Sequence, residues 1–156
     1  MTTCSFHCQY YASPSAPPPP LPLFSCKRIP HLSCIKRGVT RVILCACLPD
    51  RYLKFPISQW SRALGYGNIT TSAVLKFYKP LFQFVDSRLG AGHNILIHCL
   101  AGAHRAGTAG ISCLMYLCEL DPATATTLAK RARPAIDPIG HFPQLLELLG
   151  RALDSA

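Results

Sequence analysis

The sequence places one thiol and one guanidinium at the two ends of a short loop rich in small residues. Cys99 and Arg105 flank this loop, which contains Ala101 and Gly102. Successive backbone N–H groups in such a loop can turn inward and bind an anion. A nearby cation and a helix N-terminus both lower the pKa of a thiol from its usual value near ~8.5, which favours a thiolate at Cys99. The pattern predicts a thiolate that attacks a phosphate group held by the loop and by the arginine.

Two regular elements are expected to hold this loop in place. The apolar residues 95–97 precede it and follow a glycine-containing turn at 90–92, which is the pattern of a buried strand. An apolar helix is predicted to begin near Arg105, and its unpaired N–H groups favour negative charge at that end. Cys113 and Cys118 lie on the same apolar helix, and we interpret both as packing residues.

The rest of the pattern predicts an α/β fold. Residues 39–48 are almost continuously apolar, as expected for a strand covered on both faces. Thr70, Thr71 or Ser72 could cap one helix and Asp121 another, and Pro80 should kink the first of these helices. The predicted helices are residues 70–89, 106–120, 121–131 and 140–152. Strands that alternate with helices favour a central, mostly parallel sheet flanked by helices, with the anion-binding loop between a core strand and the following helix.

Residues 98–105 match the signature loop of the cysteine-dependent protein phosphatases, and the Ala-Gly pair within it is typical of the dual-specificity branch. Segments that resemble an early core strand, the helix before the signature strand and the closing segment of that family are residues 38–49, 73–89 and 131–149. The chain therefore resembles a dual-specificity protein phosphatase over about residues 31–152. The resemblance implies hydrolysis of phosphotyrosine, phosphoserine and phosphothreonine in proteins through a phosphocysteine intermediate.

The resemblance also implies a role for each residue of the loop. Cys99 would be the nucleophile, Arg105 would bind the phosphoryl oxygens, and His98 would order the loop from behind through a hydrogen bond. The phosphate-binding loop would consist of Leu100, Ala101, Gly102, Ala103, His104 and Arg105. We expect His104 to be an exposed residue at the rim. No metal and no other cofactor is expected.

The general acid is difficult to assign. The family places an aspartate upstream of the cysteine, and an ungapped alignment puts Asn68 there, which cannot supply a proton. No Asp or Glu occurs between Asp50 and Asp86, and Asp86 should face away from the loop on its helix. Three readings stay open. The chain turns over poor leaving groups slowly, since a positioned acid contributes ~10²–10⁴-fold; or Asp50 is the acid; or the chain is a pseudophosphatase that binds phosphorylated partners without efficient turnover.

A second departure from the family follows the arginine. The family has Ser or Thr at the position of Ala106, where a hydroxyl stabilises the thiolate as it leaves the phosphocysteine. Thr108 is close by, but we expect its hydroxyl to bond within the first helical turn. Hydrolysis of the phosphocysteine should therefore be slow.

The chain has nine cysteines and no visible secretory signal, which favours reduced thiols and a cytoplasmic location, with the nucleus as an alternative. Cys45 and Cys47 share one side of the predicted early strand, whose end should lie near the loop. One of them is a candidate partner for Cys99 in a reversible disulfide.

Residues 1–30 are rich in proline and are predicted to be a disordered tether, whereas residues 31–156 are predicted to form a single catalytic domain. Residues 13–22 also fit a ligand for a proline-recognising module. The cysteines and histidines near the N-terminus have no spacing typical of a zinc site.

The net charge of +9 attracts anions. We interpret the charge as a field that draws phosphorylated proteins, with RNA or a phosphoinositide as alternative substrates. Nucleic-acid binding is disfavoured because the basic residues are scattered. The predicted apolar helices are shorter than the ~20 residues that a membrane span requires.

Overall fold

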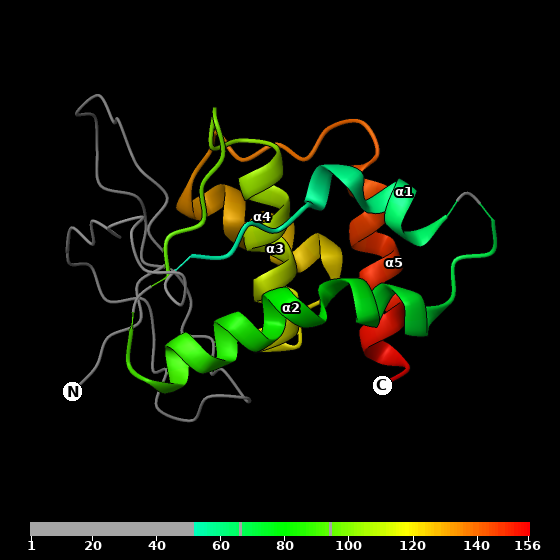
Figure 1. The fold of residues 1–156 in the computed structure, drawn as a ribbon. Helices are drawn as coiled ribbons and strands as arrows, with labels where there is room; N and C mark the ends of the chain where they lie inside the picture. Colours follow the sequence, from blue (N-terminus) through cyan, green and yellow to red (C-terminus); the bar gives the residue numbers. More distant parts are fainter. Residues whose placement is uncertain (1–51, 66, 94) are drawn as a thin grey trace.

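The computed structural model describes residues 52–65, 67–93 and 95–156, and in this part of the chain the regular structure is helical (Figure 1). A short 3-10 turn, η2 (Ile57–Gln59), leads into the first α-helix. The α-helices are α1 (Trp60–Leu64), α2 (Thr71–Gly90), α3 (Arg105–Cys118), α4 (Pro122–Ala132) and α5 (Phe142–Asp154). The helices predicted from the sequence at residues 70–89, 106–120, 121–131 and 140–152 are confirmed within a few residues.

Helix α2 forms where the sequence has a cap followed by apolar residues at helical spacing. Thr70 is the N-cap, and its side chain accepts a hydrogen bond from the Ala73 N–H at 3.2 Å. Pro80 lies inside the helix and has no N–H to donate. The residues of α2 that are buried are Val74, Tyr78, Leu81, Phe82, Val85 and Leu89. This face therefore covers the core, as the spacing predicts.

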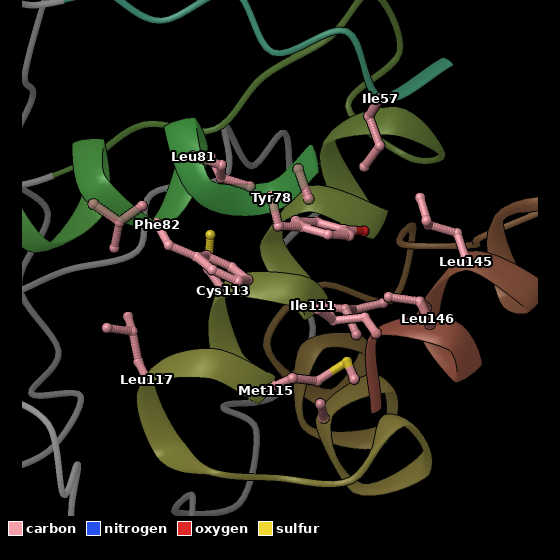
Figure 2. Packing of buried hydrophobic residues seen from close by; sticks show 14 of the residues in the cluster. Ile57, Tyr78, Leu81, Phe82, Ile111, Cys113, Met115, Leu117, Leu145 and Leu146 are labelled. Carbon is pink, nitrogen blue, oxygen red and sulfur yellow. The ribbon is translucent and has the colours of Figure 1, made fainter. Parts of the chain in front are cut away.

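Helix α3 lies at the centre of the core and contacts α2, α4, α5 and η2. Figure 2 shows side chains of α3, among them Ile111 and Met115, between residues of α2 and α5. Cys113 is fully buried, and Cys118 is partly buried against the same cluster. The interpretation of both cysteines as packing residues is confirmed.

Helices α4 and α5 complete the packing around α3. Asp121 caps α4 by accepting hydrogen bonds from the N–H groups of Ala123 and Thr124, each at 3.0 Å. The leucines of α5 that are buried are Leu145, Leu146, Leu148 and Leu149. Gly150 lets α5 approach α4 closely, because a Cβ at this position would lie 2.9 Å from Cγ of Pro122.

A row of buried hydroxyl groups links the core to the loop before α3. Tyr78 and Ser112 form a hydrogen bond at 3.0 Å, and the Ser112 hydroxyl donates to the Thr108 carbonyl at 2.9 Å. Thr108 Oγ1 in turn donates to the carbonyl of His104 at 2.7 Å. Burial raises the pKa of Tyr78 well above its ordinary value, so this phenol stays protonated. The hydroxyl groups thus tie α2 and α3 to the end of the loop.

The prediction of an α/β fold with a central parallel sheet is wrong for the part of the chain that the structure describes. No β-strand and no sheet are formed there: within residues 95–98, Leu96 forms an isolated β-bridge, and the other residues belong to no helix or strand. A strand is defined by backbone hydrogen bonds to a neighbour, and an apolar run such as 95–97 becomes one only when a partner segment pairs with it. The apolar pattern alone therefore overstated the strand content.

Several predictions lie outside the described residues. They concern the strand at 39–48, the proline-rich segment at 13–22, the domain boundary at residue 31, Asp50, and Cys45 and Cys47. Among the helices that are described, none is both long enough and apolar enough to cross a membrane.

Candidate active site

Cys99 lies in the loop between residues 95–98 and α3, and the loop backbone curls around its sulfur. The Gly102 N–H donates a hydrogen bond to Cys99 Sγ at 3.2 Å. Gly102 has a φ of +67°, a left-handed conformation that glycine adopts without strain. The inward turn of the backbone that the sequence predicts is therefore present at this residue.

The surroundings of Cys99 favour its thiolate. Burial raises the pKa of this thiol, but the N–H groups of Ala106, Gly102 and Ala101 and the charge of Arg105 lower it. The net effect places the pKa below the ordinary value for cysteine. Because N–H dipoles and a guanidinium stabilise negative charge, the same groups that hold a thiolate also suit a phosphate group beside it.

A cleft of about 470 Å³ opens beside the sulfur. Residues from two parts of the chain line it: Leu96, Ile97, His98, Cys99, Leu100, Ala101 and Gly102 from the loop region, and Arg133, Pro134 and Ala135 from the connection between α4 and α5. Leu100 stands at its edge with 96% of its surface exposed. Among the described residues of this lining, Arg133 carries a positive charge and most of the others are apolar. The cleft therefore suits a ligand in which an anionic group is attached to an apolar group.

The connection after α4, residues 133–137, packs on the loop, and we call it the 133–137 segment. A Cβ at Gly102 would lie 2.9 Å from both Nη atoms of Arg133, so the guanidinium rests on the loop backbone. The Asp137 N–H donates to the Ala103 carbonyl at 3.3 Å. In Figure 1 this orange segment runs from α4 past the loop that precedes α3. The sequence did not predict this wall of the site, because the basic residues near position 133 are part of a positive charge that is scattered along the chain.

The other loop side chains occupy different positions. Arg105 is exposed at the first turn of α3, where its charge acts on Cys99 from outside the cleft lining. The His98 ring lies 6.4 Å from the Tyr52 ring, measured between centroids. His104 is half-buried, and its Nδ1 lies 2.5 Å from the carbonyl oxygen of Asp137.

Several curated dual specificity protein phosphatases are similar to this chain. Dual specificity protein phosphatase 9 of Homo sapiens is 31% identical over 104 residues, which are 66% of this chain and 23% of the relative. Dual specificity protein phosphatase 19 of Mus musculus is 32% identical over 79 residues, 51% of this chain and 36% of the relative. Dual specificity protein phosphatase 6 of Homo sapiens is 29% identical over 105 residues, 67% of this chain and 23% of the relative.

By sequence, this chain is a relative of the dual specificity protein phosphatases. The resemblance to the dual specificity protein phosphatases is thereby confirmed. The matches span well under half of the length of each of these three relatives. No protein-family model matches the chain.

The structure does not bring every predicted residue of a dual specificity phosphatase site to Cys99. Asn68 is exposed and is absent from the cleft lining. Figure 1 shows the connection from α1 to α2 at the right of the molecule and the loop before α3 at the upper left. Asp86 accepts a hydrogen bond from the Tyr116 hydroxyl at 2.7 Å, which agrees with its predicted orientation away from the loop. Asp50, the other candidate acid, lies outside the described residues.

Ala106 and Thr108 lie at the start of α3 as the sequence predicts. Ala106 is buried and offers only its N–H to the thiolate. The Thr108 hydroxyl bonds to the His104 carbonyl, which confirms the expected bond within the first helical turn. The hydroxyl that dual specificity phosphatases place directly after the arginine is therefore not replaced by Thr108.

Metal ligands do not cluster in the described part of the chain: residues 52–65, 67–93 and 95–156 contain no group of three or more His, Cys, Asp and Glu side chains that could hold a metal ion.

Proposed function

We propose that this chain hydrolyses phosphate monoesters on phosphoproteins through a phosphocysteine at Cys99. One observation carries the proposal: the Gly102 N–H donates to Cys99 Sγ at 3.2 Å, and nearby backbone N–H groups together with the charge of Arg105 lower the pKa of the thiol. The names of the relatives support a protein as the substrate. The resemblance of the signature loop implies a phosphorylated tyrosine, serine or threonine as the reacting side chain.

In the first step the Cys99 thiolate attacks phosphorus. A sulfur–phosphorus bond forms, the bond from phosphorus to the side-chain oxygen breaks, and that oxygen must gain a proton. The loop N–H groups and Arg105 stabilise the charge on the phosphoryl oxygens. Among the residues that the structure describes, no carboxylate lines the cleft, and we propose that water protonates the leaving oxygen. Phosphotyrosine would then react faster than phosphoserine or phosphothreonine, because a phenolate leaves more readily than an alkoxide.

In the second step water attacks the phosphocysteine. The sulfur–phosphorus bond breaks, inorganic phosphate leaves, and the thiolate is restored. Ala106 offers the departing sulfur no hydroxyl, and the hydroxyl of Thr108 is held by His104. We therefore propose that this step is slow and limits turnover.

A second candidate function is the binding of phosphorylated proteins without efficient turnover. The observation that favours it is the pair of departures at Asn68 and Ala106. Asn68 would impair the first chemical step, and Ala106 would impair the second. The phosphate-binding groups of the loop would be unaffected by either residue.

The test is the hydrolysis of aryl phosphates with graded leaving-group pKa by the wild type, by Cys99→Ser and by Cys118→Ser as a control thiol outside the cleft. We expect turnover in the wild type and in Cys118→Ser, a loss in Cys99→Ser, and a steep dependence on the leaving group. A flat dependence would mean that a general acid is in place. An absence of turnover with phosphate binding retained would favour the second candidate function.

Rapid quenching measures the second step separately. We expect a burst of phenol release approaching one equivalent per Cys99, with labelled phosphate retained on the protein. Equal rates for the burst and for steady-state turnover would contradict a slow second step.

A further inference from the structure

His104 joins the loop to the 133–137 segment through its side chain. Its Nδ1 lies 2.5 Å from the backbone carbonyl oxygen of Asp137. A carbonyl oxygen can only accept a hydrogen bond, so Nδ1 carries the hydrogen and donates it. The imidazole is thus held in one orientation, in contrast to the exposed rim residue that the sequence predicts.

The backbone on both sides of this hydrogen bond is fixed as well. The Asp137 N–H donates to the Ala103 carbonyl at 3.3 Å, so Asp137 is bound through both its N–H and its C=O. The His104 carbonyl accepts from the Thr108 N–H at 2.8 Å and from Thr108 Oγ1 at 2.7 Å. The side chain of His104 is therefore hydrogen-bonded to the 133–137 segment, and its carbonyl is hydrogen-bonded to the first turn of α3.

Side-chain packing at either end of the 133–137 segment holds it against the same two elements. The guanidinium of Arg133 rests on Gly102, whose N–H reaches Cys99 Sγ. Ile136 rests on Gly107 of α3, where a Cβ would lie 2.8 Å from Cγ2 of the isoleucine. Along the chain, His104 lies between Gly102 and Gly107, the two residues that these side chains contact. Loss of the hydrogen bond from His104 to Asp137 would remove a contact between the segment and the loop two residues after Gly102, whose N–H reaches the sulfur.

We propose that His104 is a positioning residue for the site, and that its Nδ1–H bond to the Asp137 carbonyl holds the loop in the conformation that aims its N–H groups at Cys99 Sγ. The proposal rests on the proposed function for its link to catalysis. Its link to the thiolate can be measured without any turnover. His104 acts here through the backbone and does not need to touch the substrate.

The alkylation of Cys99 by iodoacetamide as a function of pH tests the proposal, with Cys118→Ser as the common background. Asparagine at position 104 places an amide N–H at the position of Nδ1 of the histidine ring, within reach of the Asp137 carbonyl. Glutamine places its amide N–H at the position of Nε2 of the ring, beyond reach of Asp137. We expect His104→Gln and His104→Ala to raise the midpoint of alkylation by about half a pH unit, and His104→Asn to stay near the wild type. His141 is the matched control, because it is also the N-cap of a helix and makes no capping hydrogen bond with its side chain.

Phosphatase kinetics give the second readout. Loss of one such hydrogen bond should reduce kcat/KM by roughly two- to tenfold in His104→Gln and leave it near the wild type in His104→Asn and in His141→Gln. An unchanged midpoint in His104→Gln, or an equal shift in the asparagine and glutamine variants, would overturn the proposal. The expected midpoints in a protein that hydrolyses no phosphate would support the role of His104 and reject the proposed function instead.

Discussion

Gly107 and Gly110 both lie on α3, and replacing each of them with alanine tests how closely Ile136 packs on this helix. A Cβ at Gly107 would lie 2.8 Å from Cγ2 of Ile136, whereas nothing lies within 4 Å of a Cβ at Gly110. Within a helix alanine is favoured over glycine by about 1 kcal/mol. We therefore expect Gly110→Ala to increase the free energy of unfolding by up to about 1 kcal/mol.

Gly107→Ala should have the opposite effect. A contact of 2.8 Å requires Ile136 to move, and overpacking of a close contact costs about 1–3 kcal/mol. This cost exceeds the intrinsic gain of about 1 kcal/mol from alanine. The variant should lose up to about 2 kcal/mol, so the two alanine variants should differ by about 1–3 kcal/mol.

Urea unfolding followed by circular dichroism measures both variants. In an Ile136→Ala background the obstructing methyl group is absent, so Gly107→Ala should become neutral or stabilising there. The result that would refute the reasoning is an equal stabilisation by Gly107→Ala and Gly110→Ala in the wild-type background. Ile136 would then not pack on α3, and the 133–137 segment would lack one of its two side-chain contacts.

Three further predictions concern the site and the core. Ala106→Ser should supply the missing hydroxyl and speed hydrolysis of the phosphocysteine, seen in rapid-quench experiments as a smaller burst and a faster steady state. Gly102→Ala should raise the alkylation midpoint of Cys99, because the left-handed φ of +67° and the Arg133 guanidinium 2.9 Å away both oppose a Cβ; an unchanged midpoint would contradict the loop geometry. Burial raises the pKa of Tyr78, so the folded state keeps a proton that the unfolded state loses above about pH 10. The free energy of unfolding should therefore fall as the pH rises above about 10, and less steeply in Tyr78→Phe than in the wild type.

The helices could be predicted from the sequence because their determinants are local. Thr70 and Asp121 cap helices whose first turns follow them directly in the chain. The apolar residues of α2 and α5 repeat at the spacing of one helix face, so the buried face of each can be read from a single segment. The packing role of Cys113 followed from its place in the same kind of pattern.

The sheet and the wall of the site could not be predicted in this way. An apolar run such as residues 95–97 has the composition of a strand, but pairing depends on another segment, and the described residues contain no strand. Nothing in the pattern of the 133–137 segment marks Arg133 or Asp137 as neighbours of the loop. Their positions depend on how α4 packs on α3 and where the chain must turn to reach α5.

The sequence by itself determined the chemistry that is available, because a thiol, an arginine and small loop residues at this spacing lie within one short segment around Cys99. It also determined the two departures, at Asn68 and Ala106, by which this chain differs from the pattern of the dual specificity phosphatases that it resembles. Only the tertiary structure decided what surrounds the sulfur. The Arg133 guanidinium, the bond from His104 to Asp137 and the use of the Thr108 hydroxyl by His104 all depend on contacts made when the helices pack together.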